Sequence, residues 1–214
     1  PVAELADLAH AAGAVMLTDA VQGYGRVAIP PAVDLVAISA HKIYGPKGIG
    51  ALWVRDGVAL APVQHGGGQE AGLRSGTLSP ALCAGFGAAA RLMRTRAAED
   101  RAHVGQLWAE ARTLFADWEL NGSADARYHG NLNLRRAGID AARLISDMRG
   151  VAFSAGSACA SGSGRPSHVL AALGLSATGA RASIRLGFGR STTLEELREA
   201  ARLIGLAAAR QEAA

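Results

Sequence analysis

One lysine in the first quarter of the chain stands where its amine could do chemistry. Lys42 follows the apolar run 34–38 after Ser39, Ala40 and His41, and a glycine-rich turn comes directly after it. Partial desolvation at the end of a buried strand makes an amine nucleophilic toward an aldehyde. An ordinary surface lysine at a strand end fits the same four residues, so this segment alone only suggests a site.

An acidic residue ends another apolar run. Asp19 comes after residues 14–17, and Gln22 follows three positions later. Ligands of open α/β sheets bind at the carboxyl ends of the strands, so Asp19 and Lys42 could face the same ligand. The alternative for Asp19 is the N-cap of a helix.

The two cysteines lie in contrasting surroundings. Cys159 sits in residues 154–164, which are nearly all Gly, Ala and Ser and predict an accessible loop, where a thiolate could act as a nucleophile. A small residue filling a tight turn is the alternative. Cys83 lies in an apolar helical pattern and is expected in the core without a chemical role. Two cysteines make no disulfide framework, and we expect both to be reduced.

Composition excludes several classes of protein. The formal net charge is +4 over 214 residues, but the cations are dispersed, which argues against a nucleic-acid or lipid surface. No apolar stretch reaches the ~18 residues of a membrane span, and the first residues lack the pattern of a secretion signal. The histidines lack metal-ligand spacing, so no metal site is expected. We predict a cytoplasmic protein.

Periodicity predicts alternating helices and strands in two domains. The fold class is α/β: residues 1–95 form a mainly parallel sheet domain, and residues 96–214 form a smaller α+β domain. Expected helices are 4–12, 80–118 as one helix or two joined helices, 139–149, 169–173 and 194–209. Expected strands are 14–17, 34–38, 50–54, 131–134, 151–153 and 182–188, with a loop at 157–167.

Several segments together resemble one family. The chain resembles the carboxyl-terminal portion of the group I cysteine desulfurases, which belong to the class V aminotransferase superfamily and have the pyridoxal-phosphate (PLP) fold type I, like aspartate aminotransferase. Each motif is weak alone, but their order is specific and covers nearly the whole chain. The matching segments are residues 19–22, 39–50, 65–70, 74–77, 157–162 and 182–185.

The resemblance implies a role for each residue near the first two strands. Lys42 would bind PLP as a Schiff base and move protons. Asp19 would pair with the pyridine nitrogen and Gln22 with the ring oxygen, while Ser39 and His41 would hold the phosphate.

The resemblance also implies roles for three further residues. Thr77 would reach the phosphate of the neighbouring subunit in a homodimer. Arg185 would bind the carboxylate of L-cysteine with its planar guanidinium. Cys159 would take sulfur from L-cysteine as a persulfide, release L-alanine, and pass the sulfur to an acceptor or iron–sulfur scaffold protein, for cluster or thio-cofactor assembly.

Family members are longer, and the amino-terminal half of their PLP domain has no counterpart here. We expect a fragment or partial gene product, a half of a split enzyme being one alternative and a truncated non-catalytic partner another. Selenocysteine lyase and other class V PLP enzymes are alternative activities.

Overall fold

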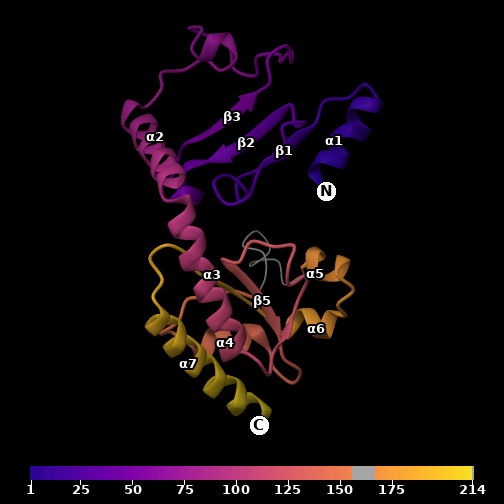
Figure 1. Ribbon diagram of the computed structural model, residues 1–214, viewed down its shortest axis with the longest axis vertical. Helices are drawn as coiled ribbons and strands as arrows, with labels where there is room; N and C mark the ends of the chain where they lie inside the picture. Colours follow the sequence, from indigo (N-terminus) through magenta and orange to yellow (C-terminus); the bar gives the residue numbers. More distant parts are fainter. Residues whose placement is uncertain (156–166, 214) are drawn as a thin grey trace. The chain divides into compact units, whose positions relative to one another are not determined.

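The chain folds into two compact units. The computed structural model describes residues 1–155 and 167–213 (Figure 1). One unit comprises residues 1–98 and the other residues 99–214, and each has its own core.

The first unit is built on a three-stranded sheet in the order β1-β2-β3. The strands are β1 (Leu17–Asp19), β2 (Leu35–Ser39) and β3 (Gly50–Val54). β1 and β2 run parallel, with Asp19 opposite Ala37, whereas β2 and β3 run antiparallel. The connection from β2 to β3 is too short for a crossover helix, and an antiparallel pair needs only a turn.

A buried carboxylate fixes the register of this sheet. Asp34 accepts a hydrogen bond from the backbone N–H of Met16 at 2.7 Å, and its own N–H donates to the Met16 carbonyl at 2.9 Å. His10 contacts the same carboxylate at 2.7 Å, and the Arg55 Nε lies 3.1 Å from its other oxygen. The Asp34 carbonyl accepts from the Arg55 backbone at 2.8 Å. Asp34 therefore joins the beginnings of β1 and β2, the end of β3 and the first helix.

Two α-helices and two short 3₁₀ helices complete this unit: α1 (Val2–Ala11), α2 (Pro80–Thr95), η1 (Ala40–Ile43) and η2 (Glu70–Gly72). Small residues let α2 approach the turn that contains η1. A Cβ on Gly85 of α2 would lie 3.1 Å from Pro46, and one on Gly45 would lie 3.1 Å from Ala89 of α2. Ile43, Ala89 and the Met93 side chain form the buried contact between η1 and α2.

The second unit has a three-stranded antiparallel sheet in the order β4-β5-β6, with β4 (Glu119–Leu120), β5 (Asn131–Arg135) and β6 (Ser183–Gly187). Its helices are α3 (Ala97–Leu114), α4 (Ala141–Asp147), α5 (His168–Ala172), α6 (Ala177–Arg181) and α7 (Leu194–Glu212). Thr193 and Glu196 form a capping box at the start of α7.

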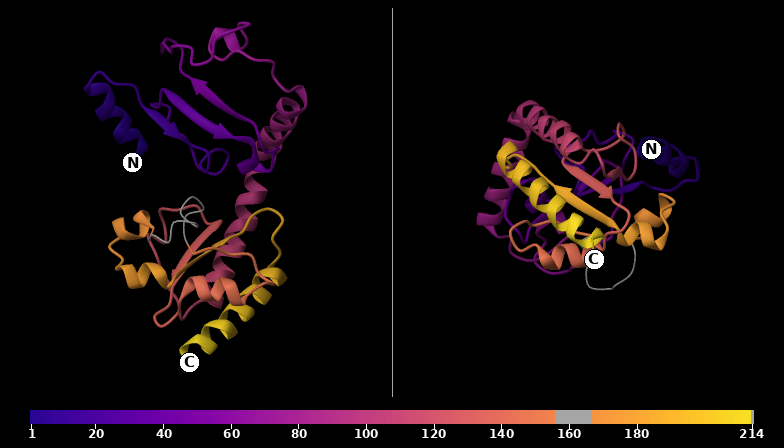
Figure 2. Two further views of the ribbon diagram at one scale, coloured as in Figure 1. Left: turned by 180° about the vertical axis from the view of Figure 1, so that it is seen from behind. Right: turned by 90° about the horizontal axis from the view of Figure 1, so that it is seen from below.

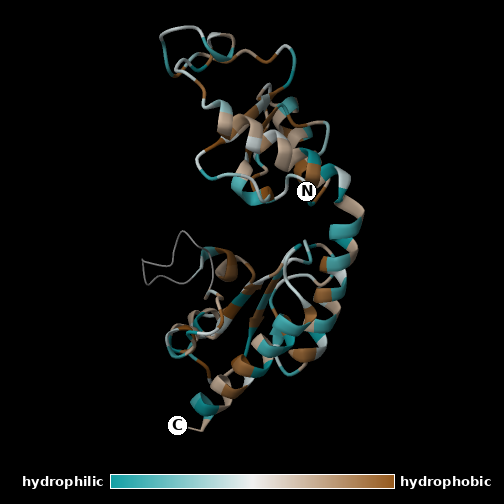
Figure 3. Cartoon of the chain, turned by 90° about the vertical axis from the view of Figure 1, so that its left-hand side faces the viewer, coloured by the Kyte–Doolittle hydropathy of each residue, from teal (hydrophilic) through white to brown (hydrophobic). Residues whose placement is uncertain are grey.

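One face of this sheet is apolar and the other is polar. Alternate residues of β5 and β6, including Leu132, Leu134 and Ile184, are buried together with residues of α3, α4 and α7. Figure 2 shows α7 extended along the strands, and Figure 3 shows hydrophobic and hydrophilic residues interspersed along the helices. The residues between the apolar ones, among them Asn133 and Arg185, lie on the opposite face.

Several sequence predictions are confirmed and others are wrong. The predicted strands at 34–38, 50–54, 131–134 and 182–188 are present within one or two residues. The 80–118 segment is two helices, which was one of the two expected alternatives; they are separated at Arg96, and the second ends at Leu114. No strand forms at 151–153, where a single bridge joins Ser154 to Arg185. The short elements β4 and α6 were not predicted.

Cys83 is exposed, so the prediction that it lies in the core is wrong. The buried side of α2 contains Ala89 and Met93, and Cys83 lies on another side of the helix. Within the part of the chain that the structure describes, none of the helices combines the length and the apolarity that a bilayer span requires.

The Asp34 network predicts a pH dependence of stability. Hydrogen bonds from the Met16 backbone and from His10 lower the pKa of Asp34, and the Arg55 guanidinium lowers it further. Because the folded-state pKa lies below the unfolded one, this stabilisation is complete above about pH 4 and is lost as the pH falls through the folded-state pKa. We expect Asp34→Asn to lower stability at pH 7 and to flatten its decline below about pH 5, measured by urea denaturation at a series of pH values. The exposed Asp56→Asn variant is the control, and an equal pH profile for both variants would contradict this account.

Candidate functional site

The parallel pair β1–β2 brings two predicted site residues to one edge of the first sheet. Asp19 is the last residue of β1, and Lys42 lies in η1, which begins directly after β2. Because both strands run in the same direction, their carboxyl ends meet at this edge (Figure 1).

Asp19 caps a turn and presents a carboxylate. Its Oδ1 accepts from the backbone N–H of Val21 at 2.9 Å, and the segment that follows is a series of turns closed by bonds to the Ala20 and Gly23 carbonyls. The N-cap of an α-helix is therefore not the structure at this position. Among the described residues, the second carboxylate oxygen of Asp19 has no partner, and the residue is exposed.

Arg26 connects the turn after β1 to the turn after β2. It donates to the Gln22 side-chain oxygen at 2.7 Å and to the Gln22 carbonyl at 3.2 Å, and its other terminal nitrogen donates to the Lys42 carbonyl at 2.6 Å. Arg26 was not predicted from the sequence, although its position four residues after Gln22 could have indicated a contact between the two side chains. Because a guanidinium can only donate, this contact occupies the oxygen of the Gln22 amide and leaves its NH₂ as a donor.

Lys42 is half-buried in a turn that is fixed on both sides. The neighbouring residue Ile43 is fully buried against α2, and Tyr44 ends the turn with a left-handed backbone conformation at φ 66°. A bulky residue at positive φ is strained, so the surrounding packing must hold it there. The Lys42 amine forms no hydrogen bond or ion pair with any described residue.

Ser39 and His41 form a polar pair beside Lys42. The Ser39 hydroxyl lies 2.7 Å from Nδ1 of His41, which orients the imidazole and leaves its Nε2 available. His41 is exposed and Ser39 is half-buried.

The groups at this edge suit a ligand with an aldehyde, a ring nitrogen, a ring oxygen and a phosphate. Lys42 contributes an amine that no described residue bonds, Asp19 a carboxylate oxygen and Gln22 an amide NH₂. The hydroxyl and imidazole of Ser39 and His41 are groups that commonly bind phosphate. The residues present therefore fit such a group.

Thr77 lies in the segment between η2 and α2. It is exposed and outside any helix or strand, and no described residue bonds its side chain. The segment just before it is held to residues 64–69: Ser75 donates to the Gln64 carbonyl at 3.0 Å, and Gly76 donates to the Gln69 side chain at 2.9 Å.

The remaining two predicted residues lie outside the first unit. Arg185 is at the centre of β6 on the polar face of the second sheet, half-buried and without a side-chain partner among the described residues. Cys159 lies outside the described residues.

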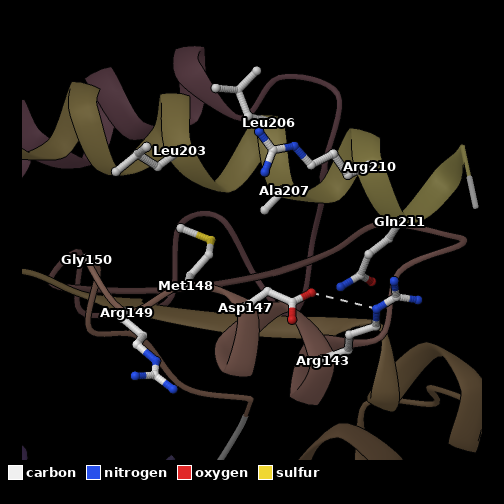
Figure 4. Close-up of a pocket in the computed structure, with 10 residues that line it drawn as sticks. All are labelled: Arg143, Asp147, Met148, Arg149, Gly150, Leu203, Leu206, Ala207, Arg210 and Gln211. Atoms are coloured by element: carbon white, nitrogen blue, oxygen red, sulfur yellow. Dashed lines mark ion pairs between the residues drawn. The ribbon is translucent and has the colours of Figure 1, made fainter.

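A cavity of about 420 Å³ in the second unit has none of the described predicted site residues in its lining. It lies between the end of α4 and α7, with an apolar floor that includes Met148, Leu203 and Ala207 and with arginines around it (Figure 4). The only ion pair among its lining residues joins Arg143 to Asp147 at 3.7 Å. Its lining, within the part of the chain that the structure describes, includes no lysine or cysteine.

A family model and the sequences of known proteins match this chain over most of its length. Residues 1–199 match the family model described as aminotransferase class-V. The chain is 46% identical over 211 residues to the mitochondrial cysteine desulfurase of Saccharomyces cerevisiae, covering 92% of this chain and 41% of that protein. It is 44% identical over 212 residues to the cysteine desulfurase IscS of Colwellia psychrerythraea, covering 95% of this chain and 52% of that protein.

A solved structure shares the fold. The X-ray structure of a NifS-like protein from Rickettsia africae ESF-5 superposes with a TM-score of 0.84 at 27% identity, covering 96% of this chain and 57% of that one. The chain thus spans about half the length of the relatives that it matches.

The role of Arg26 is tested by its removal. We expect Arg26→Ala to destabilise the chain by on the order of 1 kcal/mol, because it deletes the hydrogen bonds between the two turns. Arg26→Lys should recover only part of the stability that Arg26→Ala loses, since an ammonium lacks the fork that reaches both Gln22 and Lys42. Urea denaturation measures both variants against Arg91→Ala, an exposed α2 arginine with no partner among the described residues. Equal effects of Arg26→Ala and Arg91→Ala would count against the bridge.

Proposed function

Because the chain belongs to the class-V aminotransferase family, we propose that it is the carboxyl-terminal part of a PLP-dependent cysteine desulfurase. In this proposal residues 1–95 are the carboxyl-terminal half of the PLP-binding domain, and residues 96–214 are the small domain that carries the cysteine loop. The activity would convert L-cysteine to L-alanine and leave the sulfur as a persulfide for an acceptor.

The observation that supports this proposal most is the edge formed by β1 and β2. At the carboxyl ends of two adjacent parallel strands it combines a half-buried lysine amine with a carboxylate oxygen, neither of which has a partner among the described residues. The relatives named cysteine desulfurase, at 44% and 46% identity, add independent support.

Five residues of the first unit would hold PLP, which when bound supplies an electron sink for bond breaking at the substrate. Lys42 would bind it covalently through Nζ, and the free oxygen of Asp19 would keep the ring nitrogen protonated. The NH₂ of Gln22, oriented by Arg26, would donate to the ring oxygen. Ser39 and His41 would donate to the phosphate.

Substrate binding and sulfur transfer would use the remaining residues. Arg185 would bind the L-cysteine carboxylate. The Cys159 thiolate would attack the substrate sulfur, forming an S–S bond while the Cβ–S bond breaks, and the carbon would take up a proton to give L-alanine.

We also propose a cytoplasmic homodimer in which Thr77 contributes to the phosphate site of the partner subunit. The first unit exposes apolar side chains of β1 and β3, including Leu17, Leu52 and Trp53, which supports further protein packing against its sheet.

About half of each relative has no counterpart in this chain, and that half would supply the rest of the PLP domain. A sulfur acceptor or iron–sulfur scaffold protein would receive the persulfide.

The lysine assignment has a sharp test because the chain contains only two lysines, Lys42 and Lys47. After incubation with PLP and reduction with borohydride, we expect peptide mass spectrometry to find the phosphopyridoxyl group on Lys42. Lys42→Ala should abolish the label and Lys47→Ala should retain it. The reaction is run on the chain alone and with the amino-terminal half of a relative added. Labelling restricted to Lys47 would refute the assignment, and label that appears only with the added half would indicate a split site.

The two cysteines provide a matched pair for the sulfur step. We expect Cys159→Ser to abolish persulfide formation from L-cysteine while Lys42 is still labelled by PLP. Cys83→Ser should behave like the unmodified chain, because Cys83 is an exposed residue with no proposed role. Persulfide is measured by mass spectrometry after alkylation, and a full yield from Cys159→Ser would rule out Cys159 as the acceptor.

A further inference from the structure

Three polar residues form a row across the polar face of the second sheet. Asn133 of β5 lies directly opposite Arg185 of β6 in the antiparallel register. On the other side, Ser154 forms a bridge with Arg185: the Arg185 N–H donates to the Ser154 carbonyl at 2.6 Å, and the Ser154 N–H donates to the Arg185 carbonyl at 3.1 Å. Directly opposed residues have Cβ atoms about 5 Å apart on one face of a sheet, so the side chains of Asn133 and Arg185 leave the sheet beside one another.

The Arg185 guanidinium lacks a counter-charge in the described parts of the chain, although the residue is half-buried. Other arginines of this unit are paired, such as Arg190 with Asp100 and Arg136 with Glu212. A partly desolvated guanidinium without a partner favours binding an anion, and a carboxylate matches its planar fork.

A series of hydrogen bonds determines which atom of the Asn133 side-chain amide, oxygen or nitrogen, is used within this network. Arg135, which can only donate, bonds the Asn121 side-chain oxygen at 2.7 Å. The Asn121 NH₂ must therefore donate, and it bonds the Asn133 side-chain oxygen at 2.6 Å and the Ser183 hydroxyl at 3.0 Å. Asn121 and Ser183 are buried, so this polarity is fixed by groups that water does not reach.

The NH₂ of Asn133 is the free end of this network. Its oxygen is occupied by Asn121, and no described residue accepts a bond from its nitrogen. The row thus presents N–H donors from two adjacent side chains and no acceptor from the Asn133 amide.

We propose that Asn133 is a substrate-binding residue, whose NH₂ donates to the α-carboxylate that Arg185 binds. This inference rests on the proposed role of Arg185 in substrate binding. The pair selects a carboxylate over a carboxamide, because an amide NH₂ placed against two donors would leave donors facing one another. Arg135 and Asn121 are positioning residues that set the polarity of Asn133.

The test is binding of L-alanine, which carries the same α-carboxylate as L-cysteine, compared with L-alaninamide. In ¹⁵N NMR titrations of the full chain, we expect L-alanine to shift the Asn133 side-chain amide and Arg185 Nε signals with one saturation curve, and L-alaninamide to shift neither. Asn133→Asp keeps an oxygen for Asn121 but presents an anion, and it should weaken L-alanine binding at least tenfold.

Asn131→Asp is the matched control. Asn131 is on the same strand and face, opposite Gly187, and has no side-chain partner among the described residues. It adds the same charge and should change the affinity no more than about twofold. Urea denaturation of each variant checks that the fold persists, and Asn133→Ser, which keeps a hydroxyl donor, should bind more tightly than Asn133→Asp.

The outcomes separate this inference from the function on which it rests. A response of Arg185 without Asn133, or equal weakening by Asn131→Asp and Asn133→Asp, overturns the role of Asn133 and leaves Arg185 as the carboxylate ligand. No response of either residue to L-alanine overturns both roles, while the PLP label on Lys42 reports separately on the proposed cofactor site. Equal shifts with L-alanine and L-alaninamide overturn carboxylate selection.

Discussion

The candidate site depends on the buried carboxylate of Asp34 at the opposite end of the strands. Asp34 receives the Met16 N–H before β1 begins, donates its own backbone N–H to Met16, and bonds Arg55 after β3 ends. These contacts fix where each strand starts. Since β1 and β2 run parallel, fixing their beginnings also fixes the heights at which they end. Asp19 and Lys42 share an edge for this reason.

Arginine has the same structural task in both units. Arg26 occupies the oxygen of the Gln22 amide directly, and Arg135 orients the Asn133 amide through Asn121. A side-chain amide has a donor end and an acceptor end of nearly equal shape, so it needs a neighbour of fixed polarity to specify one orientation. A guanidinium serves this purpose because it never accepts a hydrogen bond. In both units no described residue accepts a hydrogen bond from the NH₂ of the amide.

The two units differ in how completely they bury their own apolar surface. The second unit has a continuous core in which the apolar face of the sheet packs with α3, α4 and α7. The first unit has two small clusters, and it leaves Leu52, Trp53 and Leu8 substantially exposed. The relatives are about twice as long as the matched segment, and the larger exposed surface belongs to the unit that carries Lys42. The proposed PLP site therefore belongs to the unit with more unburied apolar surface.

The sequence by itself determined the family and most of the elements. Apolar runs that end in polar residues marked β2, β3, β5 and β6, and the ordered motifs around Asp19, Lys42 and Arg185 identified the class-V relatives. These signals are local, because periodicity and motif order depend only on neighbouring residues. The exposure of Cys83 was missed, since it depends on which side of a helix meets another element.

Only the tertiary structure decided the contacts between distant residues. The direction of β3, the bridge from Arg26 to Lys42 and the pairing of Asn133 with Arg185 join positions separated by between about ten and fifty residues. No periodicity encodes such pairs, because strand register and turn packing select them after the elements have formed. The sequence thus identified which residues could act, and the tertiary structure determined which neighbours orient them.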